Sequence, residues 1–394
     1  MRKNINLILS IIIILTANLI WQTQSFAISP ISNIDCQLLD ATNYLSTQQS
    51  TATGEITGFG GNSDWASIGL VTAGLDPASF SYQSSPTIVQ YLASNPLDPA
   101  SSATTIEKRI LAINALRQDP QNFYGINYLD QLLGSYQANQ LGDPTLLNDD
   151  IFGIMALLGS NQTTQIALLD SLNYLVDNQE PDGGFGYSLS SGSDTNDTAS
   201  ALVALISSQR AGLTHPNLDQ VIAGAINYLI PSQNLDGGFG YLPGDPSDGS
   251  STAWGLIALN AIGTIQDVQA YQGLASQWLI DNQLSDGGFG YLAEYGSDTY
   301  TTSHALIALT GNTWLNPQSD QLSCNDQATD PVQSNSQDTP ADSSNQTTQA
   351  ETGTVQGYTQ VTSLPNTGSS NLVSLVIVLM PLTAILRKIT RIAS

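Results

Sequence analysis

The hexapeptide Asp-Gly-Gly-Phe-Gly-Tyr occurs three times without change, at residues 182–187, 236–241 and 286–291. In each copy a Gln lies three residues before the Asp, and an aromatic–Leu pair lies just upstream of that Gln. A short polar loop and then an Ala-, Leu- and Ile-rich run follow each copy. The copies start 54 and 50 residues apart, a spacing that indicates a repeat architecture.

The segments around the motif predict two kinds of helix in each repeat. Residues 166–178 carry apolar side chains three and four positions apart, which is typical of a helix with one buried face. The run that starts after a polar cap at Asp194 is apolar nearly all round, so we expect a helix that is buried on every side. Gly183 and Gly184 suit the sharp turn between the two. Amphipathic helices that alternate with fully buried helices predict two concentric layers.

Weaker copies extend the repeat toward the N-terminus, so that residues 35–324 hold six helical hairpins. We interpret residues 58–61 as a degraded copy of the glycine loop. Six hairpins can form an open solenoid or close into an (α/α)6 toroid, and closure is favoured because neither end hairpin has the polar outer face that a solenoid cap needs. A closed ring brings Cys36 and Cys324 together, which predicts a disulfide; the alternative is two free thiols.

The two ends of the chain predict export and attachment at the cell surface. In residues 1–27, a basic start, an apolar run and small residues before Ala27 predict a secretory signal peptide, the alternative being a membrane anchor. Residues 325–363 are too polar to form a core and predict a disordered stalk. Residues 364–394 contain a pentapeptide, an apolar segment of nearly bilayer-spanning length and a basic tail. The pentapeptide is Leu364, Pro365, Asn366, Thr367 and Gly368.

The order of these last three features resembles a sortase cell-wall sorting signal. The resemblance implies sortase and the cell wall as partners and an extracellular, surface-anchored location, whereas a retained membrane span is the alternative. The formal charge of −24, with 9 basic residues, argues against a nucleic-acid partner, because a phosphate backbone needs a Lys and Arg footprint.

The pattern Gln-x-x-Asp-Gly-Gly-Phe-Gly resembles the QW-type repeat of the squalene and terpenoid cyclases and of protein prenyltransferase β subunits. The resemblance covers residues 35–315 and implies an all-α (α/α)6 toroid whose function lies where the inner helices begin, at the mouth of a central cavity. In the cyclases an Asp-x-Asp-Asp-Thr-Ala motif protonates the substrate. Its equivalent here is residues 194–199, in which Asn196 stands at the position of the acid, and the chemistry would survive only if Asp197 had replaced it.

In the prenyltransferases an Asp-x-Cys pair and a later His hold a catalytic zinc. Here Asp248 matches the Asp, but Ser250 and Thr301 stand at the Cys and His positions. His304, one turn deeper, is more often a buried structural residue than a ligand in such a setting. We therefore predict no metal and no cofactor.

The remaining candidates lie near the starts of the inner helices, where they either line a ligand cavity or serve as helix caps and core. They are Asp64, Trp65, Asp194, Asp197, Asp248, Trp254, Tyr300 and His304. The favoured hypothesis is a surface toroid without catalytic activity that binds a small molecule, lipid, glycan or partner in its cavity. The alternatives are a divergent isoprenoid cyclase or prenyltransferase, a carbohydrate-active (α/α)6 enzyme that uses the carboxylates, and a rigid spacer or adhesin with a filled cavity.

Overall fold

The computed structural model describes residues 34–58, 62–315, 317–319 and 322–324. The predicted signal peptide, stalk and sorting signal lie outside the described residues. Among the residues that are described, no helix has the length and apolar character that crossing a membrane requires.

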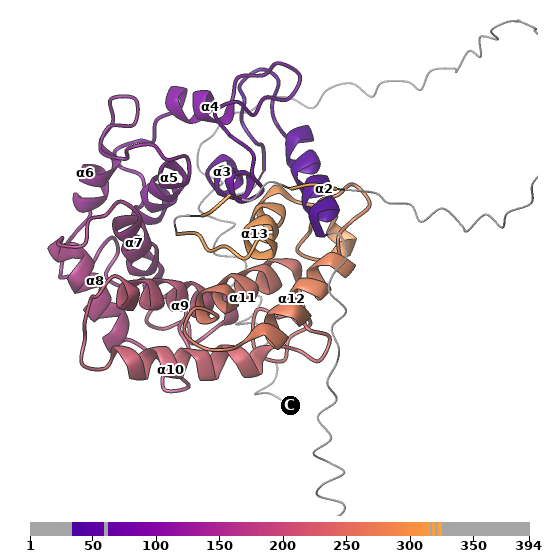
Figure 1. Ribbon diagram of the computed structural model, residues 1–394. Coiled ribbons are helices and arrows are strands. Elements are labelled where there is room, and N and C mark those ends of the chain that lie inside the picture. The colour runs from indigo at the N-terminus through magenta and orange to yellow at the C-terminus, as the bar shows by residue number, and fades with distance from the viewer. Residues whose placement is uncertain (1–33, 59–61, 316, 320–321, 325–394) are drawn as a thin grey trace, which may run out of the picture. The chain divides into compact units, whose positions relative to one another are not determined.

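Twelve α-helices in the described residues form two concentric layers, with the inner helices around the centre of Figure 1 and the outer helices outside them. The outer helices are α2 (Ile34–Thr47), α4 (Ile88–Ser94), α6 (Tyr128–Leu133), α8 (Ile166–Asp177), α10 (Leu218–Leu229) and α12 (Gln269–Asp281). The inner helices are α3 (Asn62–Thr72), α5 (Ala103–Ala115), α7 (Asn148–Gly159), α9 (Thr195–Arg210), α11 (Gly249–Ile262) and α13 (Thr299–Leu309). Two short 3-10 helices, η1 (Ile230–Ser232) and η2 (Ala293–Tyr295), lie in the loops.

The inner layer is a closed ring. Each inner helix contacts the next one in the chain, and α13 contacts α3 as well as α11. The predicted (α/α)6 toroid is therefore confirmed, and an open solenoid is excluded.

The two kinds of helix follow the predicted pattern of burial. On α8, Leu168, Leu172 and Leu175 are buried, whereas Ile166 and Leu169 on the other side are exposed. On α9, nearly every residue from its second turn to Ile206 is buried. An outer helix thus turns one apolar face to the ring, and an inner helix is enclosed by neighbours on all sides.

The repeated motif joins each hairpin to the next. Gln179 Nε2 donates to the carbonyl of Gly183 in its own loop (2.7 Å) and to the carbonyl of Val221 in α10 (2.7 Å). Gly183 has φ +89°, and a Cβ at this position would lie 2.5 Å from the carbonyl oxygen of Gly224 in α10. Only glycine permits both this backbone conformation and this close approach. The constant spacing of Gln and Gly in the motif is therefore the spacing that the contacts between neighbouring repeats require.

The third copy of the motif makes the same joint to the first repeat and so closes the ring. Gln283 Nε2 donates to its own loop at Gly287 (2.7 Å) and to the carbonyl of Gln37 in α2 (2.8 Å). Next to this joint, Cys36 and Cys324 form a disulfide with their Cα atoms 4.8 Å apart. The predicted disulfide is confirmed.

Residues 59–61 of the predicted relic of the glycine loop (58–61) lie outside the described residues. The first repeat makes its joint earlier in the same connection between α2 and α3, where Gln49 Nε2 donates to the carbonyls of Gly54 (3.0 Å) and Pro86 (3.3 Å). Gly54 has φ +81°, and the buried Ile56 takes the place of the motif's Phe. This loop is one residue longer between Gln and Gly than the intact copies, which conceals it from a search by spacing.

Candidate functional site

The inner helices of the last three repeats begin at aspartates that cap them. Asp194 accepts from the amide of Asp197 (2.8 Å), Asp248 accepts from the amide of Ser251 (2.7 Å), and Asp298 accepts in the same way. Burial raises the pKa of Asp248 to about 6. Helix capping, one of the two roles expected for these residues, thus accounts for one oxygen of each of these carboxylates.

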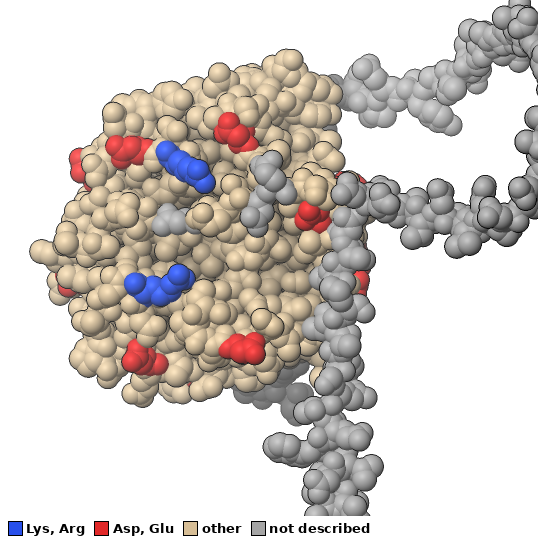
Figure 2. Space-filling model, in the orientation of Figure 1, with Lys and Arg blue, Asp and Glu red and all other residues tan. Residues whose placement is uncertain are grey.

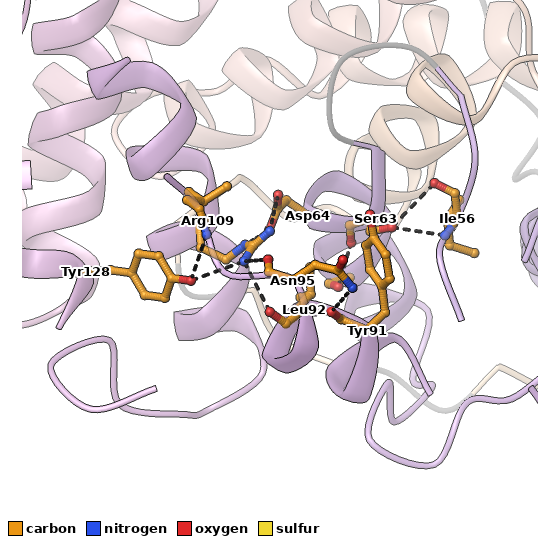
Figure 3. A network of polar contacts seen from close by, with 10 residues as sticks. Ile56, Ser63, Asp64, Tyr91, Leu92, Asn95, Arg109 and Tyr128 are labelled. Atoms are coloured by element: carbon orange, nitrogen blue, oxygen red, sulfur yellow. Dashed lines mark hydrogen bonds and ion pairs between the residues drawn. The ribbon is translucent and has the colours of Figure 1, made fainter. Parts of the chain in front are cut away.

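Asp64, at the start of α3, has a different partner. Its Oδ1 lies 2.6 Å from Arg109 Nε on α5, and both side chains are buried. Figure 3 shows the guanidinium between Asp64 and the hydroxyl of Tyr128, with Nη1 also directed at the carbonyls of Leu92 and Asn95. The Asp64 carboxylate therefore belongs to a buried ion pair that joins the first two repeats, a role that the sequence analysis did not foresee.

Asp194 and Asp197 form a buried pair of carboxyl groups at the start of α9. Burial raises the pKa of Asp197 well above its usual range, and the neighbouring Asp194 raises it further. Asp194 also accepts a hydrogen bond from the hydroxyl of Tyr241 (3.0 Å), the last residue of the second copy of the motif, at residues 236–241. Burial raises the pKa of Asp194 as well, although the hydrogen bonds that it accepts lower it. Of the two carboxyl groups, Asp197 therefore has the pKa that is raised further.

Five aromatic side chains meet inside the ring, and we call them the central aromatic cluster: Trp65, Phe152, Trp254, His304 and Trp314. They come from α3, α7, α11, α13 and the segment after α13. The ring centroids of Phe152 lie 5.9 Å from Trp65 and 6.1 Å from Trp254, although these residues stand on helices that are not neighbours. Contacts across the ring show that these side chains point toward its axis.

Trp314 closes the cluster from the side where the inner helices end. In Figure 1 the chain after α13 turns back across the middle of the ring. Trp314 is 0% exposed, and its centroid lies 4.9 Å from that of Trp254 and 6.1 Å from that of His304. The sequence analysis missed Trp314; a Trp in a polar stretch directly after the last inner helix was the available signal.

His304 is buried at the centre of this cluster. Its Nδ1 lies 2.8 Å from the carbonyl oxygen of Tyr300, so that Nδ1 carries the hydrogen and Nε2 does not. Burial lowers the pKa of His304 to about 4, which keeps the ring neutral at physiological pH. Tyr300 packs on His304 with centroids 4.3 Å apart, and burial raises the pKa of its hydroxyl.

The positions that the resemblance assigns to zinc ligands hold two hydroxyl groups in contact. Ser250 Oγ and Thr301 Oγ1 are 3.0 Å apart and share a hydrogen bond. Within the described residues, no group of three or more His, Cys, Asp and Glu side chains is arranged to hold a metal ion.

A further carboxyl group that the sequence analysis missed lies between α5 and α7. Glu107 is 0% exposed, and neither of its oxygens has a hydrogen-bond partner. It faces Gly153 of α7, where a Cβ would lie 3.2 Å from Glu107 Oε1. Burial raises the pKa of Glu107 well above its usual range, and the charges of Asp149 and Asp150 raise it further.

A closed ring of six helical hairpins around an aromatic centre defines the class of protein. Residues 41–291 match the family model of the prenyltransferase alpha-alpha toroid domain, and the chain belongs to this family.

Individual relatives are similar over short stretches or in fold alone. Drimenyl diphosphate synthase from Streptomyces showdoensis is 36% identical over 90 residues, which are 23% of this chain and 17% of the synthase. Unsaturated glucuronyl hydrolase from Streptococcus agalactiae has a TM-score of 0.53 at 12% identity, covering 70% of this chain and 91% of the hydrolase. A type II terpene cyclase from Scytonema has a TM-score of 0.51 at 13% identity, covering 71% of this chain and 96% of the cyclase. At such identities the structural likeness concerns the fold.

Proposed function

We propose that this protein is an exported, surface-anchored toroid that binds a ligand inside its ring and catalyses no reaction on it. The observation that carries the proposal is the hydrogen bond between Ser250 and Thr301, at the positions where the family resemblance implies zinc ligands. These two hydroxyls, of which Thr301 Oγ1 also donates to Asp298 Oδ2 (2.8 Å), are a poor donor set for zinc, which prefers thiolate, imidazole and carboxylate. At the cyclase acid position, Asn196 has an amide, which has no acidic proton to give.

The aromatic centre supports a binding role. Ligand sites are mostly apolar and aromatic, with a few polar groups that fix orientation. The central aromatic cluster, with Asn196, Ser250 and Tyr300 one turn nearer the starts of the inner helices, has this composition.

The location rests on the two ends of the chain and on the disulfide. A signal peptide in residues 1–27 and a sorting signal in residues 364–394 would expose the ring outside the cell, with sortase and the wall or membrane as partners. A disulfide between Cys36 and Cys324 suits such an oxidising location. Figure 2 shows a few well separated Lys and Arg side chains on the face in view, whereas a nucleic-acid partner needs a continuous basic surface.

Native mass spectrometry of the purified protein, before and after solvent extraction, tests the binding role. We expect a co-purified small molecule, lipid or glycan that extraction removes. Metal analysis of the same sample tests the lack of catalysis, because zinc at one equivalent per chain would overturn it. A bare chain in both spectra would favour a rigid spacer.

One observation favours an enzyme as a second candidate. Asp197 is a buried carboxyl whose pKa is raised well above its usual range by burial and by Asp194, as suits an acid catalyst. A divergent isoprenoid cyclase or prenyltransferase, or a carbohydrate-active enzyme, could use it. The test is turnover of polyprenyl and glycan substrate panels that Asp197→Asn abolishes and that Asp219→Asn, on the exposed side of α10, leaves intact.

A further inference from the structure

We propose that the ligand inside the ring is a neutral pyranose, such as one sugar unit of a glycan, and not a hydrocarbon. This inference rests on the binding function proposed above and names the class of its ligand. Its basis is a set of buried polar atoms around the ring axis that the protein itself leaves without hydrogen bonds.

The ring interior has two layers that follow from helix periodicity. Asn148 precedes Phe152 on α7, Ser250 precedes Trp254 on α11, and Tyr300 precedes His304 on α13, each by four residues. Residues four apart lie one above the other on the same helix face. Because the later member of each pair points to the ring axis, the earlier member forms a polar layer above the aromatic one, toward the starts of the inner helices.

Polar atoms in both layers are buried and have no hydrogen-bond partner among the described residues. The acceptors are Asn148 Oδ1, Asn196 Oδ1 and His304 Nε2, and the donor is Trp314 Nε1. His304 and Trp314 are both 0% exposed, so that bulk water does not satisfy these groups. Trp254 Nε1 faces the hydroxyl of Tyr300 in the polar layer.

This combination of groups matches a sugar better than an isoprenoid. A sugar hydroxyl both donates and accepts, so one pyranose can supply the missing partners of an indole N–H group, amide oxygens and an imidazole nitrogen at once. The C–H faces of its ring are apolar and pack well on aromatic rings, which form the central aromatic cluster. A hydrocarbon chain would seal the same polar atoms from water without satisfying any of them, and sites with unpaired polar groups strongly reject such ligands.

The charges near the polar layer favour a neutral sugar. Asp194, Asp248 and Asp298 stand at the starts of three consecutive inner helices. Lys108 on α5 is close enough to His304 to influence its titration, but it is outnumbered by these carboxyl groups. An anionic sugar would meet a net repulsion at this end of the ring.

Titration of the purified protein, followed by tryptophan fluorescence and calorimetry, tests the inference. The probes are neutral trisaccharides (maltotriose, cellotriose and chitotriose) and two isoprenols (farnesol and geranylgeraniol). We expect saturable binding of at least one trisaccharide and none of the isoprenols. His304→Phe, which keeps an aromatic ring and removes the Nε2 acceptor, should weaken sugar binding roughly tenfold or more.

The controls separate binding from folding. His215→Phe changes the other histidine of the chain, in the loop before α10, and should leave sugar binding unchanged. If His304→Phe does not fold, Asn196→Ala removes another acceptor and should give the same loss. Saturable isoprenol binding without sugar binding would overturn the inference and leave the proposed ligand-binding function standing. If neither class binds, the inference is again wrong, and the co-purified ligand sought by mass spectrometry decides the proposed function independently.

Discussion

Replacing Glu107 with Gln tests whether the contact between α5 and α7 encloses a neutral carboxyl group. Gln keeps the shape of the side chain and cannot ionise. The neutral carboxyl and the amide each leave donor and acceptor atoms unpaired at this position, where neither Glu107 oxygen has a partner. The substitution therefore isolates the cost of charge in a fully buried site.

The expected effect depends on pH, and its sign follows from the raised pKa of Glu107. A carboxyl whose pKa is higher in the folded chain favours folding at low pH, and this contribution is lost as the pH rises from the unfolded value through the folded value. Each pH unit in that window changes the free energy of unfolding by about 1.4 kcal/mol. The ordinary value is 4.5, so the loss between there and pH 7 is at most roughly 3.4 kcal/mol. At pH 7, Glu107→Gln should be more stable than wild type by up to this amount.

Urea unfolding followed by circular dichroism, at about pH 5, 6, 7 and 8, measures the difference. The two proteins should be nearly equally stable at the lowest pH and diverge as the pH rises. Glu294→Gln is the control, because this exposed residue in η2 carries the same chemical change at the surface. Stability curves of wild type and Glu107→Gln that stay parallel over the whole range, or a less stable variant at pH 7, would refute the reasoning.

Four further substitutions test the closure and the centre of the ring. Cys36→Ser, which opens the bond to Cys324, should lower the free energy of unfolding by about 2–5 kcal/mol, and an unchanged urea midpoint would contradict this. Gln283→Leu should cost about 1–3 kcal/mol by the same measurement, and Gln233→Leu should cost as much; a loss in one alone would show that the two joints are not equivalent. Trp314→Ala should cost about 3–5 kcal/mol in thermal unfolding, and a loss under 1 kcal/mol would mean that Trp314 is not packed in the centre.

Much of the fold could be predicted because the residues that join neighbouring repeats lie close together in the sequence. Gln179 and Gly183 lie four residues apart, so their spacing survives from copy to copy. The joint of the first repeat was not recognised because Gln49 and Gly54 make the corresponding contacts with one extra residue between them and with Ile56 in place of Phe. Backbone contacts tolerate such changes, whereas a motif search does not.

The candidate site was only partly predictable because its members come from different repeats. His304 looked like a core residue on an apolar helix, and it is buried as expected, but only ring closure places it against Trp65. Likewise, Asp64 was recognised as the start of an inner helix, yet its partner Arg109 lies 45 residues away on the next one. Distances of this kind depend on how the hairpins are arranged around the axis, which no single repeat encodes.

If the chain is held by its C-terminus, as we propose, the disulfide between Cys36 and Cys324 has a mechanical consequence. Any tether that continues beyond Cys324 is bonded covalently to α2 as well as being continuous with α13. A pull on that tether is shared between the first and the last hairpin, and residues 36–324 form a covalent loop that cannot lengthen under tension. Such a pull therefore cannot unravel the ring from its last helix inward.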